Sequence, residues 1–238
     1  MPMVSPAITV TSSGSVSLVC YDLASIVVSD SIVERAFSEA LATQGIVAGT
    51  EAYVRSMVRF DRLRGCPPAD VMGELFASDE SRAQAASLAF DRSFTSAVER
   101  FGVTASVQAL EGLGKIDAAG MRICLLSSLS RAASEALLGG IRRQGSADLF
   151  LCAGDVPRGF PWPDPVLTAV LRLAVADVRE VAMVSATESG LESGRRAGAG
   201  LVIGVTDDPE RVPAMRKAGA TDVLDDIAAL PEFLAAGR

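Results

Sequence analysis

Asp22 is the residue whose type and position best suit chemistry. It ends a short apolar run, residues 17–22 (SLVCYD), that is typical of a β-strand. A carboxylate at the end of a strand can act as a nucleophile or a base without a metal ion. Asp22 is therefore the first candidate for a catalytic residue. The alternative is that it only caps neighbouring backbone N–H groups.

The absence of histidine limits the remaining chemistry. None of the 238 residues is His, which excludes a Ser-His-Asp triad, a Cys-His pair and zinc sites with His ligands. Acid–base chemistry must then depend on carboxylates, Lys, Tyr, Cys or a bound group. The four cysteines form no C-x-x-C pair, so buried reduced thiols are expected at Cys20, Cys66, Cys124 and Cys152.

The elements that must position Asp22 are indicated by the rhythm of the chain from residue 116 onward. Short apolar runs alternate there with stretches of helical spacing, which predicts a parallel sheet covered by helices on both faces. We predict an α/β fold with a Rossmann-like, doubly wound parallel sheet. The strands predicted after residues 17–22 are 121–126, 148–152, 180–184, 201–205 and 221–224.

Residues that perform chemistry in such sheets lie at the carboxyl ends of the strands. Asp22, Ser127 and the loops that follow Cys152 and Val184 should therefore surround one crevice. Residues 31–101 have apolar side chains every three or four positions, which predicts an inserted helical cap over that crevice. The predicted domains are a core (residues 15–30 and 102–238), the cap (residues 31–101) and a flexible N-terminal arm (residues 1–14).

Composition and charge limit the partners. The chain has 22 Lys and Arg against 29 Asp and Glu, a net charge of −7, and an acidic surface does not attract nucleic acid or anionic membranes. No apolar run approaches the roughly 20 residues that span a bilayer, and the first residues do not resemble a signal peptide. We expect a cytoplasmic protein that binds a small-molecule substrate or ligand. The sequence leaves a homodimer open.

The strand ends resemble the motifs of the haloacid dehalogenase superfamily, over residues 16–235. In that superfamily the first strand ends in an Asp nucleophile, followed two residues later by a second Asp and then by Gly-Thr. Asp22 matches the nucleophile, whereas Ala24 replaces the second Asp, as in the phosphonoacetaldehyde hydrolase branch. Residues 33–37 (VERAF), at the start of the cap, are also similar to that branch. Ser25-Ile26 departs from its Gly-Thr.

The resemblance implies roles at the other strand ends. The second motif supplies a hydroxyl that holds a phosphoryl oxygen, and Ser127 matches it, with Ser128 beside it. The third motif supplies a cation near a Pro-x-Pro-Asp sequence. Phe160 occupies the place of that cation, and Arg158 is the nearest residue that could compensate.

The fourth motif departs furthest from the superfamily. It normally carries two Asp residues that hold Mg²⁺, but Ala186 and Gly190 stand in their places. Glu188 is displaced from both and is better explained as an exposed loop residue. Because Mg²⁺ needs oxygen ligands in near-octahedral geometry, we predict no cofactor and lost or weak Mg²⁺ binding. Without the metal and the cation, charge cannot be neutralised as phosphoryl transfer requires.

Phosphonoacetaldehyde hydrolase chemistry is also predicted to be lost. That branch forms a Schiff base between a cap Lys and its substrate, and Pro68 stands near the place of the Lys. The lysines of this chain are Lys115 and Lys217, and neither belongs to the cap.

The predicted catalytic residues are Asp22 and Ser127, and no metal ligand is predicted. Phe160 and Trp162 would make the crevice more apolar than a phosphate pocket, with core packing as the alternative. Arg59 lies in a row of cap arginines that could recognise an anion or form a solvated helix face. The predicted substrate-binding residues are Ala24, Ser128, Arg158, Phe160, Trp162 and Arg59.

Three hypotheses for the function follow. The leading one is a diverged, hydrolase-related protein that is no ordinary Mg²⁺-dependent phosphatase and uses Asp22 for metal-independent chemistry on a small organic substrate. The second is a catalytically inactive relative that binds a ligand or a partner protein. The third is a weak residual phosphatase in which Arg158 and Glu188 replace the lost groups.

Overall fold

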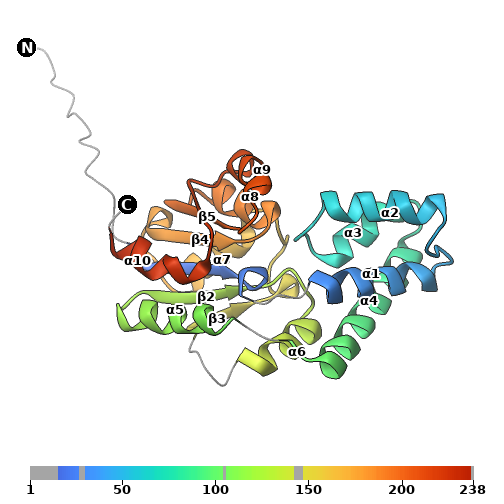
Figure 1. The fold of residues 1–238 in the computed structure, drawn as a ribbon, viewed down its shortest axis with the longest axis horizontal. Helices are drawn as coiled ribbons and strands as arrows, with labels where there is room; N and C mark the ends of the chain where they lie inside the picture. The colour runs from blue at the N-terminus through green and yellow to red at the C-terminus, as the bar shows by residue number, and fades with distance from the viewer. Residues whose placement is uncertain (1–15, 27–29, 104–105, 142–146, 237–238) are drawn as a thin grey trace, which may run out of the picture.

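One parallel sheet forms the centre of the molecule. The computed structural model describes residues 16–26, 30–103, 106–141 and 147–236. Within these residues six parallel strands have the order β3-β2-β1-β4-β5-β6 (Figure 1). The strands are β1 (Leu18–Asp22), β2 (Arg122–Leu126), β3 (Leu149–Leu151), β4 (Val181–Ser185), β5 (Leu201–Val205) and β6 (Asp222–Leu224).

The side chains of the central strand β1 are buried on both faces of the sheet. Val19 and Tyr21 belong to the larger hydrophobic core, whereas Leu18 and Cys20 belong to a second core on the opposite face. Successive side chains of a strand point to opposite faces, so a strand that is buried on both sides must be apolar throughout. The continuous apolar run of β1 is the sequence signature of that position.

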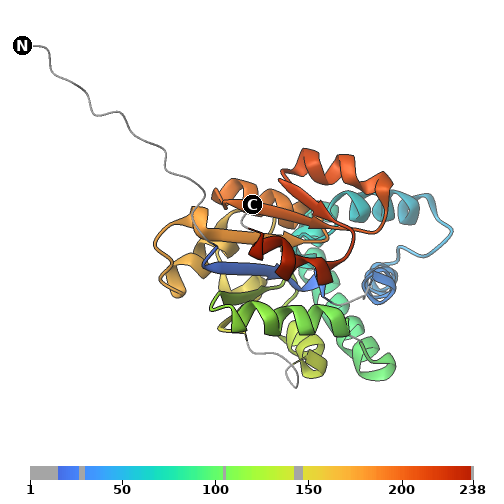
Figure 2. The same cartoon turned by 60° about the vertical axis from the view of Figure 1, so that its left-hand side comes forward.

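Helices pack on each face of the sheet (Figure 2). The larger core includes side chains of α5 (Val107–Ala118), α6 (Arg131–Ile141) and α10 (Leu230–Ala235). The opposite face is covered by α7 (Asp164–Arg172), α8 (Glu188–Ala197) and α9 (Val212–Ala218). Short 3₁₀ turns are formed by Leu23–Ser25, Ala153–Asp155, Val178–Glu180, Pro209–Arg211 and Ile227–Ala229.

The cap consists of helices inserted between β1 and β2, and it lies beside the sheet (Figure 1). Thr50 and Asp79 each accept a backbone N–H bond at the start of a cap helix, which satisfies one of the free donors there. Phe90 and Phe94 are fully buried inside the cap. The cap helices are α1 (Asp30–Thr43), α2 (Glu51–Arg62), α3 (Pro68–Leu75) and α4 (Glu80–Phe101).

The predicted fold class is confirmed. The sheet is parallel, Rossmann-like and covered on both faces, and helices are inserted after its first strand. No element is predicted from the sequence over residues 107–118, and the structure has the helix α5 there. Gly112 and Gly114 lower the intrinsic helix propensity of this segment, and the burial of Leu113 and Ile116 outweighs them.

The division into core, cap and arm stays a prediction. The arm, residues 1–14, lies outside the described residues. Among the helices that the structure describes, none combines the length and the apolar character needed to cross a bilayer.

The packing of α4 can be tested by mutation. Replacing Phe94 with Ala should lower the free energy of unfolding by about 3–5 kcal/mol, because it leaves a cavity in the cap. Leu88→Ala on the same helix is the control. Leu88 is 57% exposed, so its loss should change the stability by no more than about 0.5 kcal/mol. Urea denaturation followed by circular dichroism measures both, and equal midpoints for the two variants would contradict this packing.

Candidate active site

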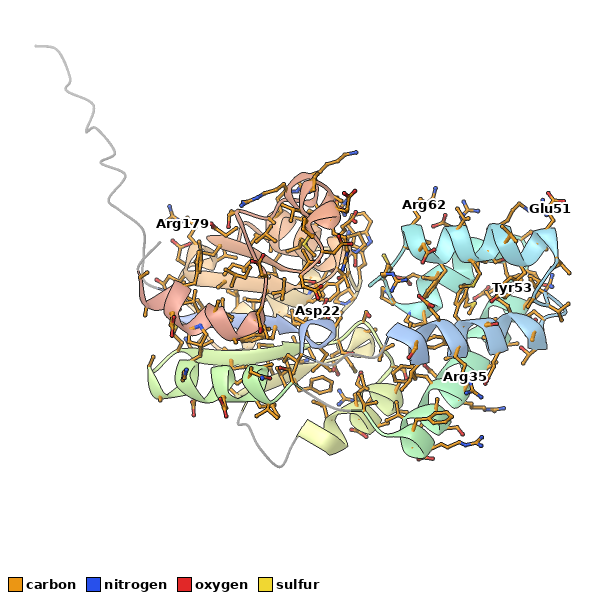
Figure 3. The ribbon with its side chains drawn as sticks, viewed as in Figure 1. Asp22, Arg35, Glu51, Tyr53, Arg62 and Arg179 are labelled. Carbon is orange, nitrogen blue, oxygen red and sulfur yellow. The ribbon has the colours of Figure 1, made fainter. Side chains whose placement is uncertain are left out.

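Asp22 lies where the order of the strands reverses. Its strand β1 has β2 on one side and β4 on the other, so the loops after β1 and β4 separate at this point. Open α/β sheets bind ligands outside the carboxyl ends of their strands at such a position. Figure 3 shows Asp22 at the edge of the core that faces the cap.

The Asp22 carboxylate is buried and hydrogen-bonded on both oxygens. The residue is only 3% exposed. Its Oδ1 accepts a bond from the Ala24 N–H at 3.1 Å, and its Oδ2 accepts bonds from Ser185 Oγ at 2.7 Å and Thr187 Oγ1 at 3.1 Å. Burial raises the pKa of Asp22 above its usual value, and the three hydrogen bonds oppose this only in part.

Asp22 forms part of the wall of a cavity of about 90 Å³ between core and cap. Among the described residues that line it, Asp22 is the only acid and Arg64 the only cation. Arg64 forms ion pairs with Glu34 at 2.9 Å and Asp61 at 3.0 Å, which already compensate its charge. The apolar lining residues are Leu23, Ala24, Val33, Phe37, Phe60, Leu63, Pro68, Val71, Leu129 and Leu137.

The surroundings of Asp22 do not fit a magnesium ion. The Ser185 and Thr187 hydroxyls occupy the space beside Oδ2. A Cβ atom added at Gly190, where the fourth motif has its second acid, would lie 2.3 Å from Ser185 Oγ and 3.1 Å from Asp22 Oδ2. Across the described residues, no three His, Cys, Asp or Glu side chains gather as a metal-binding group. Mg²⁺ would therefore find one carboxylate among the described residues, and Oδ2 of that carboxylate already accepts two hydroxyl hydrogen bonds.

Ser127 and Ser128 bring hydroxyl groups to the cavity wall. Ser127 Oγ accepts hydrogen bonds from the Leu129 N–H at 3.2 Å and from Ser134 Oγ at 2.9 Å. Both bonds use Ser127 as the acceptor, so its own O–H can be donated to a ligand.

The loop between α2 and α3 anchors the cap over the cavity. Gly65 in this loop has φ of +84°, and a Cβ atom there would lie 2.4 Å from Ser189 Oγ and 2.6 Å from Thr187 Oγ1. Ser189 Oγ also donates a hydrogen bond to the Arg64 carbonyl at 2.9 Å. Position 65 thus requires glycine for its backbone conformation and for space. The cap loop contacts Thr187, which also binds Asp22.

A wider cleft of about 740 Å³ adjoins the cavity and shares Cys66 and Ser128 with it. Trp162 lines this cleft, and the guanidinium groups of Arg158 and Arg196 lie 4.4 and 4.9 Å from its ring centroid. These distances are typical of cation–π interactions. One wall of the cleft is therefore aromatic and cationic, and it lies beside the smaller, more apolar cavity.

Cys66 lines the cavity but is not an activated nucleophile. Burial raises the pKa of its thiol to about 11, and the negative charge of Asp70 adds to the rise. Since the thiolate is the reactive form, Cys66 remains an unreactive thiol at neutral pH.

The predicted site residues are placed in three different surroundings. The cavity is lined by Asp22, Ala24, Ser127 and Ser128, and the adjoining cleft by Ser128, Arg158, Phe160 and Trp162. Arg59 lines neither of them, and its Nε pairs with Glu74 Oε1 at 2.7 Å. The roles of all these residues stay predictions.

Two of the placed residues have strong alternative partners. Phe160 is 2% exposed and belongs to the second hydrophobic core, as the alternative explanation of core packing proposed. Arg158 forms an ion pair with Asp164 at 2.9 Å. The side chain at position 160 is therefore core packing and not a cation, and the Arg158 guanidinium is paired with Asp164.

The sequence did not assign a site role to Ser185 or Thr187. Both residues lie in the segment that resembles the fourth motif, and their hydroxyls hold the Asp22 carboxylate. The signal was the pair of hydroxyl residues on either side of Ala186, the position where the motif has its first acid, because residues next to that position also lie close to the carboxylate.

Part of the chain is similar to phosphonoacetaldehyde hydrolases. It is 33% identical over 97 residues to proteins of that name from Bordetella pertussis, Bordetella parapertussis and Bordetella bronchiseptica. The alignment covers 40% of this chain and 34% of each relative, so the chain matches about a third of the length of these curated relatives. No family model matches the chain.

Solved structures resemble the whole chain. A phosphonoacetaldehyde hydrolase-like protein from Oleispira antarctica has a TM-score of 0.82 at 19% identity, over 99% of this chain and 96% of its own. A protein described as a haloacid dehalogenase-like hydrolase from Bacteroides fragilis has a TM-score of 0.73 at 17% identity, over 90% of this chain and 99% of its own. The chain thus has the haloacid dehalogenase-like fold, and the predicted resemblance is confirmed at that level.

The close contact at Gly190 is testable. Gly190→Ala should lower the free energy of unfolding by about 1–3 kcal/mol, because the new methyl group displaces the Ser185 hydroxyl. Gly73→Ala on α3 is the control, because no atom lies within 4 Å of a Cβ at that position. It should raise the stability by about 0.5–1 kcal/mol. Thermal unfolding compares the two, and a stabilised Gly190→Ala variant would rule out the contact.

The raised pKa of Asp22 predicts a pH-dependent effect on stability. Folding favours the protonated form, so the parent loses stability as the pH rises from about 3.9, the unfolded value, through the higher folded pKa. Asp22→Asn removes the cost of burying the charge and should therefore raise the stability at pH 7. The gain should vanish below about pH 3.5, where both states of the parent are protonated. Unfolding curves across this pH range measure it, and a gain confined to acidic pH would show the opposite shift.

Proposed function

We propose that this protein is a haloacid dehalogenase-like hydrolase that uses Asp22, without bound Mg²⁺, on a small and largely apolar organic substrate. The observation that carries the proposal is the position of Asp22 in the wall of a mainly apolar cavity, held by neutral donors. The whole-chain likeness to proteins named as hydrolases and the partial likeness to phosphonoacetaldehyde hydrolases support the reaction class.

The two oxygens of Asp22 have different tasks in this proposal. Oδ2 accepts the Ser185 and Thr187 hydroxyl bonds, whereas Oδ1 accepts one backbone N–H bond. The less occupied Oδ1 is the nucleophile. In the ionised form it forms a C–O bond to an electrophilic carbon of the substrate, and the leaving group departs with the electron pair of its bond. Water then hydrolyses the covalent intermediate, which is an ester after attack on an alkyl carbon and an anhydride after attack on an ester carbonyl. This step restores the carboxylate and releases the product.

Charge argues against an anionic phosphate ester as the substrate. The lining cation Arg64 is already paired with Glu34 and Asp61. A phosphate dianion beside the Asp22 carboxylate would meet uncompensated repulsion in a buried site, where screening is weak. A neutral substrate avoids that cost, and the Ser127 hydroxyl can donate a hydrogen bond to its polar group.

The activity can be tested on small esters, organic halides and phosphate esters, each assayed with Mg²⁺ and with a chelator. We expect turnover of a neutral substrate that is unchanged by the chelator. Asp22→Asn should lower kcat by about 10⁴-fold or more, as loss of a catalytic nucleophile does. Asp207→Asn, an exposed acid after β5, is the matched control and should keep full activity. Phosphate ester turnover that requires Mg²⁺ would overturn the proposal.

A second candidate is a catalytically inactive protein that binds a ligand in the same cavity. It is favoured by the hydrogen bonds on both Asp22 oxygens and by the raised pKa, which are typical of a satisfied, weakly nucleophilic carboxyl group. Trp162, the single tryptophan of the chain, lines the adjoining cleft, so its fluorescence can report binding of the same compounds. Binding that survives in Asp22→Asn, without turnover by the parent, would identify this second function.

The geometry gives no support to a residual phosphatase. Arg158 is paired with Asp164, and Glu188 is exposed and absent from the described residues that line the Asp22 cavity. Neither is positioned to replace the lost cation or the lost metal ligand.

A further inference from the structure

A groove of about 460 Å³ lies on the cap, away from the Asp22 cavity. Its residues come from α1 and α4, the most extensively packed helix pair of the described chain. Figure 3 shows Arg35 of this groove on the cap, well separated from Asp22. We call it the α1/α4 groove. It is lined by Arg35, Glu39, Thr43, Ala89, Arg92, Ser93, Ser96, Ala97, Arg100 and Phe101.

The charge of the α1/α4 groove is unbalanced. Three arginines line it, with Glu39 as the only acid among the described lining residues. Glu39 pairs with Arg35 at 2.9 Å, and neither Arg92 nor Arg100 has a carboxylate partner among the described residues. The chain as a whole carries a net charge of −7. A local excess of positive charge in an acidic protein attracts anions.

Two of the three arginines, Arg35 and Arg100, stack on an aromatic ring before any ligand arrives. The guanidinium groups of Arg35 and Arg100 lie 5.2 and 5.3 Å from the ring centroid of Phe101, which is 56% exposed. Stacking on an aromatic ring restricts a guanidinium group without using its N–H donors. The donors of Arg100 thus remain able to bind an anion, and less side-chain entropy is lost when they do.

Helix stability explains only part of this cluster. Arg100 lies in the last turn of α4, where a cation interacts favourably with the helix dipole. Arg92 lies about two turns before Arg100. Because Arg92, Ser96 and Arg100 follow one another at steps of four residues, they share one side of the helix. The helix dipole does not reach that far, so Arg92 needs another explanation.

We propose that the α1/α4 groove binds a small, multiply charged oxyanion of the pyrophosphate or nucleoside polyphosphate class, through Arg92 and Arg100, whose charges no described carboxylate compensates. Guanidinium groups match the paired oxygens of phosphate groups and form charge-assisted hydrogen bonds with them. The groove volume lies in the range of small-molecule sites. This site is separate from the proposed hydrolase site, and neither proposal depends on the other.

Calorimetric titration of the full chain with inorganic pyrophosphate, and separately with ATP, tests the proposal. We expect saturable binding of at least one of them. Arg92→Gln and Arg100→Gln should each weaken it about tenfold, because each removes a hydrogen bond to a charged group. Arg55→Gln, an exposed cap arginine on α2, should leave the affinity unchanged. Asp22→Asn should also leave it unchanged, which separates this site from the proposed active site.

Comparing pyrophosphate with ATP shows whether the groove recognises the phosphate groups alone or the nucleoside as well. Equal affinities would assign the binding to the phosphates alone, whereas tighter binding of ATP would add a contact to the base. No saturation by either ligand up to millimolar concentration would overturn the proposal. An equal loss in Arg55→Gln would do the same, because it would indicate only diffuse attraction to an arginine-rich surface.

Discussion

A buried carboxylate held only by neutral donors is the constraint on which the rest of the site depends. Asp22 is surrounded by an amide N–H and two hydroxyl groups, and its neighbouring cation is already paired. Taking a charge out of water is unfavourable unless other groups compensate it. A second negative charge in this site would be less well compensated than in a site that contains a metal ion. The cavity therefore suits neutral ligands better than anionic ones.

The fold supplies this environment through two separate features. The reversal of strand order at β1 and β4 brings Asp22 and Ser185 together from positions far apart in the sequence. The inserted cap then closes the remaining side with apolar residues of α1 and α2, such as Phe37 and Phe60, whose rings stack at 4.3 Å. Because the polar wall belongs to the core and most of the apolar wall to the cap, substitutions in either part can change the site independently.

The sequence predicted the sheet well because every inner strand is buried on both faces and therefore almost uniformly apolar. It also placed Asp22 and Ser127 on one cavity, since parallel strands end at the same edge. It could not tell how a helix is rotated, and so it left Arg59, which pairs with Glu74, open between anion recognition and a solvated helix face. Ser185 and Thr187 were missed because a hydrogen bond to Asp22 requires side-chain directions that spacing alone does not give.

The close approach of Gly65 to Thr187 and Ser189 links the position of the cap loop to the pKa of Asp22. Thr187 holds Asp22 on one side and touches the cap loop on the other, so any outward displacement of that loop would admit water to the carboxyl group. Hydration favours the ionised form. An open molecule would then carry the more anionic Asp22 and a closed one the less anionic, so that the charge of the cavity would depend on the position of one cap loop.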